Sequence, residues 1–248
     1  MTSNPGNGGA ISFSNQASGI LTVSHCSFFS CTCTITSTRD DECGGGAIYV
    51  NSISKVEVSS SLFSSCACYS SKGCDGGAIE LYIISSQPLV TGCIFHSCSA
   101  PDDGGEVSIW RARGNTDIFL CDECRFFSGR AGGAAGCLIV VSCESRVCSN
   151  CVFADSTAYD GGAVYISSSS SFPSGRYLLQ FCFFKDNSVS ISTRGNDVAL
   201  ENCMPNSTNN PIHHCFSTTP SGRVSYLNGQ WYNTDENWLP QGELNNQI

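Results

Sequence analysis

Short runs of alternating apolar and polar residues, separated by turn residues, recur along most of the chain. Residues 78–81 alternate in this way, residues 89–95 form a second run, and residues 96–100 form a third. A period of two is typical of β-strands, and no repeat shows the period of about 3.6 residues that indicates a helix. The pattern predicts an all-β chain built from many short strands.

Two motifs recur in a fixed order at intervals of about 30 residues, which is the sequence signature of a solenoid. The first is a glycine pair followed by small and β-branched residues, with copies that begin at Gly8, Gly45, Gly76, Gly104, Gly132 and Gly161. The second is Cys-x-Phe, usually with a Cys, a small residue or an Asn three positions after the phenylalanine. The repeats predict a right-handed parallel β-helix (a β-solenoid) of about six coils over residues 5–196. Residues 197–248 are predicted to form an irregular final coil and a C-terminal cap.

Equivalent residues of successive coils should stack, so each repeated inward residue becomes a column. One aromatic column is predicted from Phe28, Phe63, Phe95, Phe126, Phe153 and Phe184. One aliphatic column is predicted from Ile11, Ile48, Ile79, Val107 and Val164. Asp75, Asp103 and Asp160 precede glycine pairs and are expected to be turn residues that bond their own backbone.

The charge balance excludes several classes of partner. The chain of 248 residues has 12 Lys and Arg against 21 Asp and Glu, for a net charge of −9. Nucleic acids and anionic lipid surfaces attract basic patches, so neither is an expected partner. No apolar run is long enough to cross a bilayer, so no direct membrane insertion is expected.

The 18 cysteines bear on the compartment of the protein. Such a content is typical of secreted proteins, yet the residues after Met1 lack the basic and apolar regions of a signal peptide. We expect an extracellular or cell-surface location, with the chain a fragment of a longer protein. The alternative is an intracellular scaffold whose thiols are all reduced.

The repeat resembles that of the chlamydial polymorphic outer-membrane proteins, which combine Gly-Gly-Ala-Ile with Phe-x-x-Asn. Residues 184–187 match the second motif fully, whereas Cys31, Cys66 and Cys98 stand where that family has Asn. The closer likeness is therefore to the cysteine-rich surface proteins of parasitic protists such as trichomonads. The resemblance implies a β-helix with a role in adhesion or surface display.

The strongest candidate for a chemical site is a pair of Cys-x-x-Cys motifs. Cys121 with Cys124, and Cys148 with Cys151, have nearly the spacing of a four-cysteine zinc site, and adjacent coils would bring the pairs together. The alternative is that Cys124 and Cys151 belong to the repeated column, and that Cys121 and Cys148 form a disulfide between coils. This alternative is preferred, so no metal and no cofactor are expected.

The remaining cysteines fall into two groups. Those two residues before each phenylalanine should face inward with it and stay reduced; they are Cys26, Cys93, Cys124, Cys151 and Cys182. Loop cysteines such as Cys43 and Cys74 are expected to form disulfides.

The chain also contains residues of the types that an enzymatic site requires. Carbohydrate-cleaving β-helices use clustered carboxylates with basic residues, and the candidates here are Asp102, Asp103, Glu106, Arg111 and Arg113. Glu80 and Glu106 have roughly the same position in their repeats and could form an outward carboxylate pair, although two carboxylates alone do not specify a reaction. Because every recurring residue has a packing or turn role, we expect no catalytic residues. The expected function is a structural, adhesive module that binds a protein or glycan on a cell surface; a carbohydrate-active enzyme is the alternative.

Overall fold

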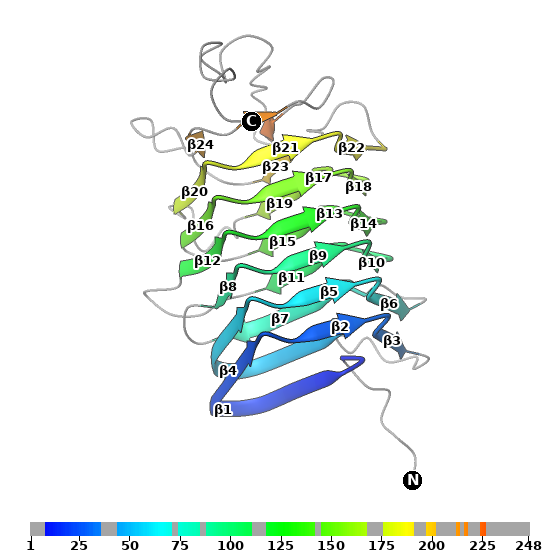
Figure 1. Cartoon of the computed structure of the whole chain (residues 1–248), viewed down its shortest axis with the longest axis vertical. Coiled ribbons are helices and arrows are strands. Elements are labelled where there is room, and N and C mark those ends of the chain that lie inside the picture. The colour runs from blue at the N-terminus through cyan, green and yellow to red at the C-terminus, as the bar shows by residue number, and fades with distance from the viewer. Residues whose placement is uncertain are drawn as a thin grey trace.

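The computed structural model of the chain is a β-solenoid in which short parallel strands stack into columns (Figure 1). The structure describes residues 8–35, 44–70, 74–84, 88–110, 118–141, 145–167, 176–190, 197–201, 212–213, 216–217 and 224–226. The predicted fold class is confirmed. The described residues contain no helix of the length and hydrophobicity that a membrane span requires.

Two columns share the long strands at the N-terminal end of the stack. These are β1 (Ile11–Ser24) and β4 (Ile48–Ser59), which pair in parallel. Both β7 and β8 pair with β4, so the sheet divides into two columns from there on. The first continues as β7 (Ile79–Ile84), β11 (Val107–Trp110), β15 (Leu138–Val141), β19 (Val164–Ser167), β23 (Val198–Glu201) and β26 (Val224–Tyr226). The second continues as β8 (Leu89–Thr91), β12 (Ile118–Asp122), β16 (Ser145–Ser149), β20 (Arg176–Gln180) and β24 (Ile212–His213).

Two further columns complete the cross-section of the solenoid (Figure 1). The third column is β2 (Ser27–Phe29), β5 (Leu62–Ser64), β9 (Ile94–His96), β13 (Arg125–Phe127), β17 (Val152–Ala154), β21 (Phe183–Lys185) and β25 (Phe216–Ser217). The fourth column is β3 (Thr32–Ile35), β6 (Ala67–Ser70), β10 (Ser99–Ala100), β14 (Arg130–Ala131), β18 (Thr157–Ala158) and β22 (Ser188–Val189). The columns continue past residue 196 through β23 to β26; most of the predicted cap lies outside the described residues.

The predicted aromatic column is confirmed along its whole length. Its six phenylalanine rings stack face to face, with neighbouring centroids 4.8–5.1 Å apart and ring planes within 10° of parallel. This spacing is the distance between paired strands, so the rings follow directly from the register of the third column. All six side chains are buried.

The aliphatic column is also confirmed, but one glycine pair was assigned wrongly. Leu138 pairs with Val107 on one side and Val164 on the other, so the repeat in this coil is Ala135-Gly136-Cys137-Leu138. Ala135 has φ +56°, in the left-handed region where Gly104 (+60°) and Gly161 (+56°) stand in the neighbouring coils. The Gly132-Gly133 pair lies three residues earlier in the preceding turn, where its resemblance to the motif is coincidental.

Candidate functional site

Each corner before the third column combines a left-handed residue with a small inward side chain. Ser60 (φ +47°), Gly92 (+58°) and Glu123 (+53°) are three of these left-handed residues. The next residue donates a side-chain hydrogen bond to the carbonyl oxygen two positions earlier. Ser61 Oγ donates at 2.7 Å, and Cys93 Sγ at 3.3 Å. Because serine fills the same role as cysteine, this position requires a small donor rather than a reactive thiol.

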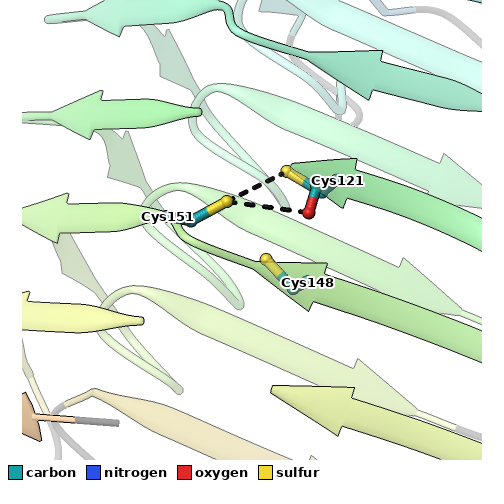
Figure 2. Close-up of side chains that lie close together, drawn as sticks. All are labelled: Cys121, Cys148 and Cys151. Carbon is teal, nitrogen blue, oxygen red and sulfur yellow. Dashed lines mark hydrogen bonds between the residues drawn. The ribbon is translucent and has the colours of Figure 1, made fainter. Parts of the chain in front are cut away.

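Three thiols converge inside the solenoid beside this corner column (Figure 2). Cys121 belongs to β12, Cys148 to β16, and Cys151 follows β16 at the corner. Their sulfur atoms all lie within 4.8 Å of one another, and Cys121 Sγ is 3.7 Å from Cys151 Sγ. All three side chains are buried. We call Cys121, Cys148 and Cys151 the thiol centre.

Two further buried cysteines, Cys124 and Cys182, flank the thiol centre. Hydrogen bonding to Cys121, and then to Cys124, lowers the pKa of Cys151 below the ordinary value of a thiol. Hydrogen bonding from Cys124, Cys148 and Cys151 together with burial raises the pKa of Cys121. The cluster therefore places a thiol with a lowered pKa, Cys151, in direct contact with a thiol with a raised pKa, Cys121. In such a pair the first sulfur loses its proton more easily, while the second keeps its proton and donates it in a hydrogen bond.

Of the four cysteines considered for zinc, the structure therefore brings three together and leaves the fourth outside the group. Cys121, Cys148 and Cys151 form the mutual group, while Cys124 lies outside it and donates to the carbonyl oxygens of Val90 (3.4 Å) and Asp122 (3.3 Å). Cys121 and Cys148 are both free thiols, so the disulfide considered between them is not formed.

The second notable interior position is Glu106, which was wrongly expected to face outward. Its backbone carbonyl accepts a hydrogen bond from Ala78, so Glu106 occupies the inward site that alanine fills in that neighbouring coil. Its side chain is fully buried, and a Cβ at Gly129 would lie only 2.8 Å from Glu106 Cγ. Glycine at 129 therefore provides the space for this side chain. Glu80 pairs instead with Ser108, so the two glutamates do not share a register.

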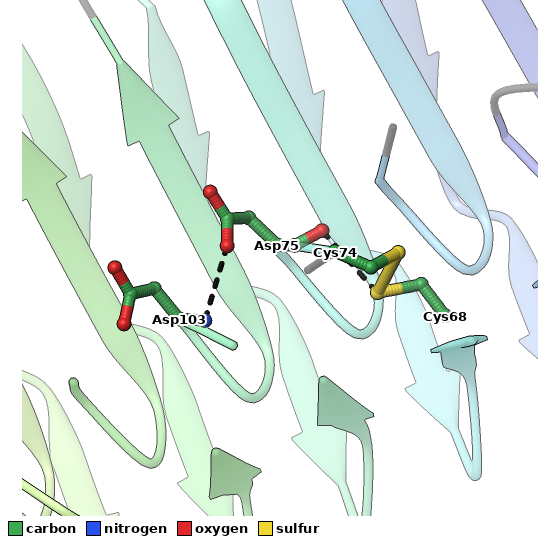
Figure 3. The surroundings of a disulfide bond; sticks show 4 residues. All are labelled: Cys68, Cys74, Asp75 and Asp103. Atoms are coloured by element: carbon green, nitrogen blue, oxygen red, sulfur yellow. Dashed lines mark hydrogen bonds between the residues drawn. A yellow bond between two sulfur atoms is a disulfide. The ribbon is translucent and has the colours of Figure 1, made fainter. Parts of the chain in front are cut away.

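Two aspartates link successive coils at the turn before the glycine pairs (Figure 3). Asp75 Oδ1 accepts a hydrogen bond from the Asp103 N–H at 3.0 Å, and Asp103 Oδ1 accepts one from the Ala134 N–H at 2.6 Å. These aspartates therefore bond the backbone of the next coil, and the prediction that they bond their own backbone was wrong. Inter-coil bonding suits the column because each turn lies directly beside the equivalent turn.

A single disulfide among the described residues lies at the same end of the turn (Figure 3). It joins Cys68 of β6 to Cys74, whose predicted partner was Cys43. The two cysteines are only 6 residues apart in the sequence, so Cys74 meets a cysteine of its own coil. Cys43 lies outside the described residues.

Burial makes several of these carboxyl groups hard to ionise. Burial, and then the nearby Asp103 carboxylate, raises the pKa of Asp75 to about 7. Burial raises the pKa of Asp103 to about 6, although the bond from Ala134 opposes the shift. Burial also raises the pKa of Glu106 well above its ordinary value.

These shifts predict that the folded chain loses stability as the pH rises from about 4 to about 7. A carboxyl whose folded pKa is raised ionises first in the unfolded chain, so its stabilising effect is complete below the unfolded pKa and disappears by the folded pKa. Each such group lowers the free energy of unfolding by about 1.4 kcal/mol per pH unit within its window. Urea unfolding of the Asp75→Asn variant should show a smaller loss over this range than the wild type. Asp155→Asn, at an exposed corner position, should keep the wild-type loss; equal slopes in both variants would contradict the assignment.

Three of the residues considered for a carbohydrate-cleaving site lie in the part of the chain that the structure describes, and their surroundings differ. Asp102 is exposed, Asp103 is engaged with the backbone of the next coil, and Glu106 lies in the interior. Arg111 and Arg113 lie outside the described residues. Comparison of the chain with protein-family models, with curated proteins and with solved structures finds no match.

Proposed function

We propose that the chain is a non-enzymatic structural module of a surface or secreted protein, and that it attaches to proteins on a cell surface. The proposed binding surface is the outward side of the third column, from β2 through β5, β9, β13 and β17 to β21, and we call it the attachment face. It is supported by the exposed apolar side chains of these strands and by their charge.

Large apolar side chains follow the attachment face from coil to coil. Phe29 is 62% exposed and Ile94 is 40% exposed. Partly exposed neighbours on the same strands are Leu62, Phe127, Val152 and Phe183. The register places Leu62 beside Ile94, and Val152 beside Phe183. An exposed apolar stripe of this kind, interrupted here by Arg125 between Ile94 and Val152, is characteristic of a protein interaction surface.

The charges on the attachment face are basic, although the whole chain has a net charge of −9. Arg125 and Lys185 are exposed on this face, and the described strands of the third column contain no Asp or Glu, although the exposed residues Glu123, Asp155 and Asp186 border these strands at the corners. Neither Arg125 nor Lys185 forms an ion pair with another described residue. Unpaired cations among apolar side chains favour a partner with an acidic, partly apolar protein surface.

A structural role is supported by the way the repeated residues are used. The phenylalanines fill the core, the corner cysteines and serine donate to nearby carbonyl groups, and Asp75 and Asp103 join coils. The single observation that carries the proposal is the apolar and basic stripe, because it has no role in this packing.

The test is the binding of fluorescently labelled chain to a panel of cultured cells. We expect saturable binding to at least one cell type, and loss of that binding after surface proteins are removed with trypsin. The variant Ile94→Ser/Arg125→Ser/Phe183→Ser should bind at least about tenfold more weakly.

The matched control changes the same kinds of side chain away from the attachment face. Tyr69 and Tyr159 are 54% and 49% exposed, and Arg130 is exposed on β14. The variant Tyr69→Ser/Arg130→Ser/Tyr159→Ser should bind like the wild type. Absence of saturable binding to every cell type would contradict an adhesive role. Binding that survives trypsin but is lost after enzymatic removal of glycans would show a carbohydrate partner instead.

A further inference from the structure

Packing alone does not account for the cysteines at positions 121 and 148. They occupy an inward column of the second set of strands, in which Val23, Val58, Val90 and Leu179 fill the equivalent sites. Cys121 pairs directly with Val90 on one side and with Cys148 on the other. The column therefore accepts branched aliphatic side chains, and two successive coils carry a smaller, sulfur-containing one.

The corner column brings a third sulfur to the same point. Cys151 donates to the Ser149 carbonyl oxygen at 3.1 Å, as Ser61 does in its own corner, and its sulfur lies 3.7 Å from Cys121 Sγ. Figure 2 shows the three sulfur atoms turned toward one another from two adjacent coils. Two unrelated columns thus meet in a group of three thiols that are each at least nine-tenths buried.

The ligand set determines which ion fits. Thiolates are soft ligands that favour Cu(I) and zinc over hard cations. Structural zinc is almost always four-coordinate, whereas the mutual group here offers three sulfurs and neither imidazole nor carboxylate. Cu(I), a d¹⁰ ion, is stable with three thiolates in a plane. With a metal–sulfur bond of about 2.3 Å, a trigonal site requires sulfurs about 4 Å apart, which small side-chain adjustments of this group provide.

We propose that Cys121, Cys148 and Cys151 bind one Cu(I) ion in a trigonal, all-thiolate site. Binding converts three thiols and one Cu(I) ion into a tris-thiolate complex of net charge −2 and releases three protons. No electron is transferred, because copper enters as Cu(I). The neighbouring Cys124 and Cys182 thiols donate to backbone carbonyl oxygens and are not ligands of the ion.

The site lies in the interior, so the ion enters while the chain folds. The test therefore starts from reduced protein that is unfolded in guanidinium and refolded without oxygen, with Cu(I) supplied as its acetonitrile complex. After loose metal is removed with a chelating resin, copper is measured by elemental mass spectrometry. Thiolate-to-copper ultraviolet absorption and the emission of solvent-shielded Cu(I) provide a second readout.

The matched variants introduce residues that already occupy the equivalent positions in other coils. Cys121→Val copies Val90, and Cys151→Ser copies Ser61, so both should fold with the wild-type circular dichroism spectrum. Each should retain about one copper ion per chain fewer than the wild type and should lose the emission. Cys93→Ser removes a thiol of the same corner column outside the thiol centre and should retain all the copper.

Copper should also raise the urea midpoint of the wild type and leave that of Cys121→Val unchanged, because the native site binds the ion more tightly than the thiols of the unfolded chain do. Equal copper content in the wild type and Cys121→Val would overturn the proposal. Preferential retention of Zn(II) in a parallel refolding would overturn the assignment to copper. A disulfide between Cys121 and Cys151 that persists under the same reducing conditions would show that the sulfurs serve as a cross-link.

Discussion

Replacing Phe126 by alanine is expected to lower the free energy of unfolding by about 3–5 kcal/mol, because the change opens a cavity at the centre of the core. Phe126 is fully buried, and its ring stacks 4.8 Å from Phe95 on one side and 4.8 Å from Phe153 on the other. Alanine would remove both stacking contacts together with the buried apolar surface. Urea unfolding followed by circular dichroism measures the loss.

The control for this variant lies on the same column but on its outward side. Phe29 is 62% exposed, so Phe29→Ala should change the free energy of unfolding by about 0.5 kcal/mol or less. Similar losses from the two substitutions would contradict this assignment of the inward and outward faces of the third column.

Replacing Gly77 by alanine is expected to cost about 3 kcal/mol or to prevent folding, although only one methyl group is added. A Cβ at Gly77 would lie 2.1 Å from the Gly105 carbonyl oxygen and 2.5 Å from the Ser99 backbone nitrogen. Both atoms belong to paired backbone, so neither can move without breaking the register between coils. The loss should appear as a lower urea midpoint or as insoluble protein.

Gly92 provides the control for Gly77, because a side chain at Gly92 would not clash with the backbone of a neighbouring coil. Its φ is +58°, and a Cβ there would meet no atom closer than 3.7 Å. Asn150 occupies the equivalent corner with φ +53°, so Gly92→Asn should change stability by about 0.5 kcal/mol or less. A loss comparable to that of Gly77→Ala would contradict the steric explanation.

The columns could be predicted from the sequence because the same residue type returns in every coil. The fifth glycine pair could not, because Ala135 takes the left-handed position while Gly132-Gly133 imitates the motif nearby. Glu106 was misplaced for a related reason: a charged residue is expected outside, and the space for it depends on Gly129, which lies 23 residues further along the chain.

The thiol centre could be predicted only in part. The Cys-x-x-Cys spacing correctly brings Cys121 beside Cys148 on paired strands. The contact between Cys121 and Cys151 joins an inward strand position to a corner position of the next coil, and it depends on how the chain bends at Asn150. No one-dimensional spacing specifies that bend.

The assignments of the core, the thiol centre and the attachment face all depend on the inward orientation of the corner cysteines. Native protein treated with a maleimide and then digested for peptide mapping tests this orientation most directly. Cys26 is exposed at the end of its column, contrary to the prediction that the whole column is shielded, so it should react quickly. Cys93, Cys124, Cys151 and Cys182 are buried and should react at least about a hundredfold more slowly, with full labelling only after unfolding. Rapid labelling of these four, or disulfides between successive members of the column, would show that the strand register is shifted by one residue.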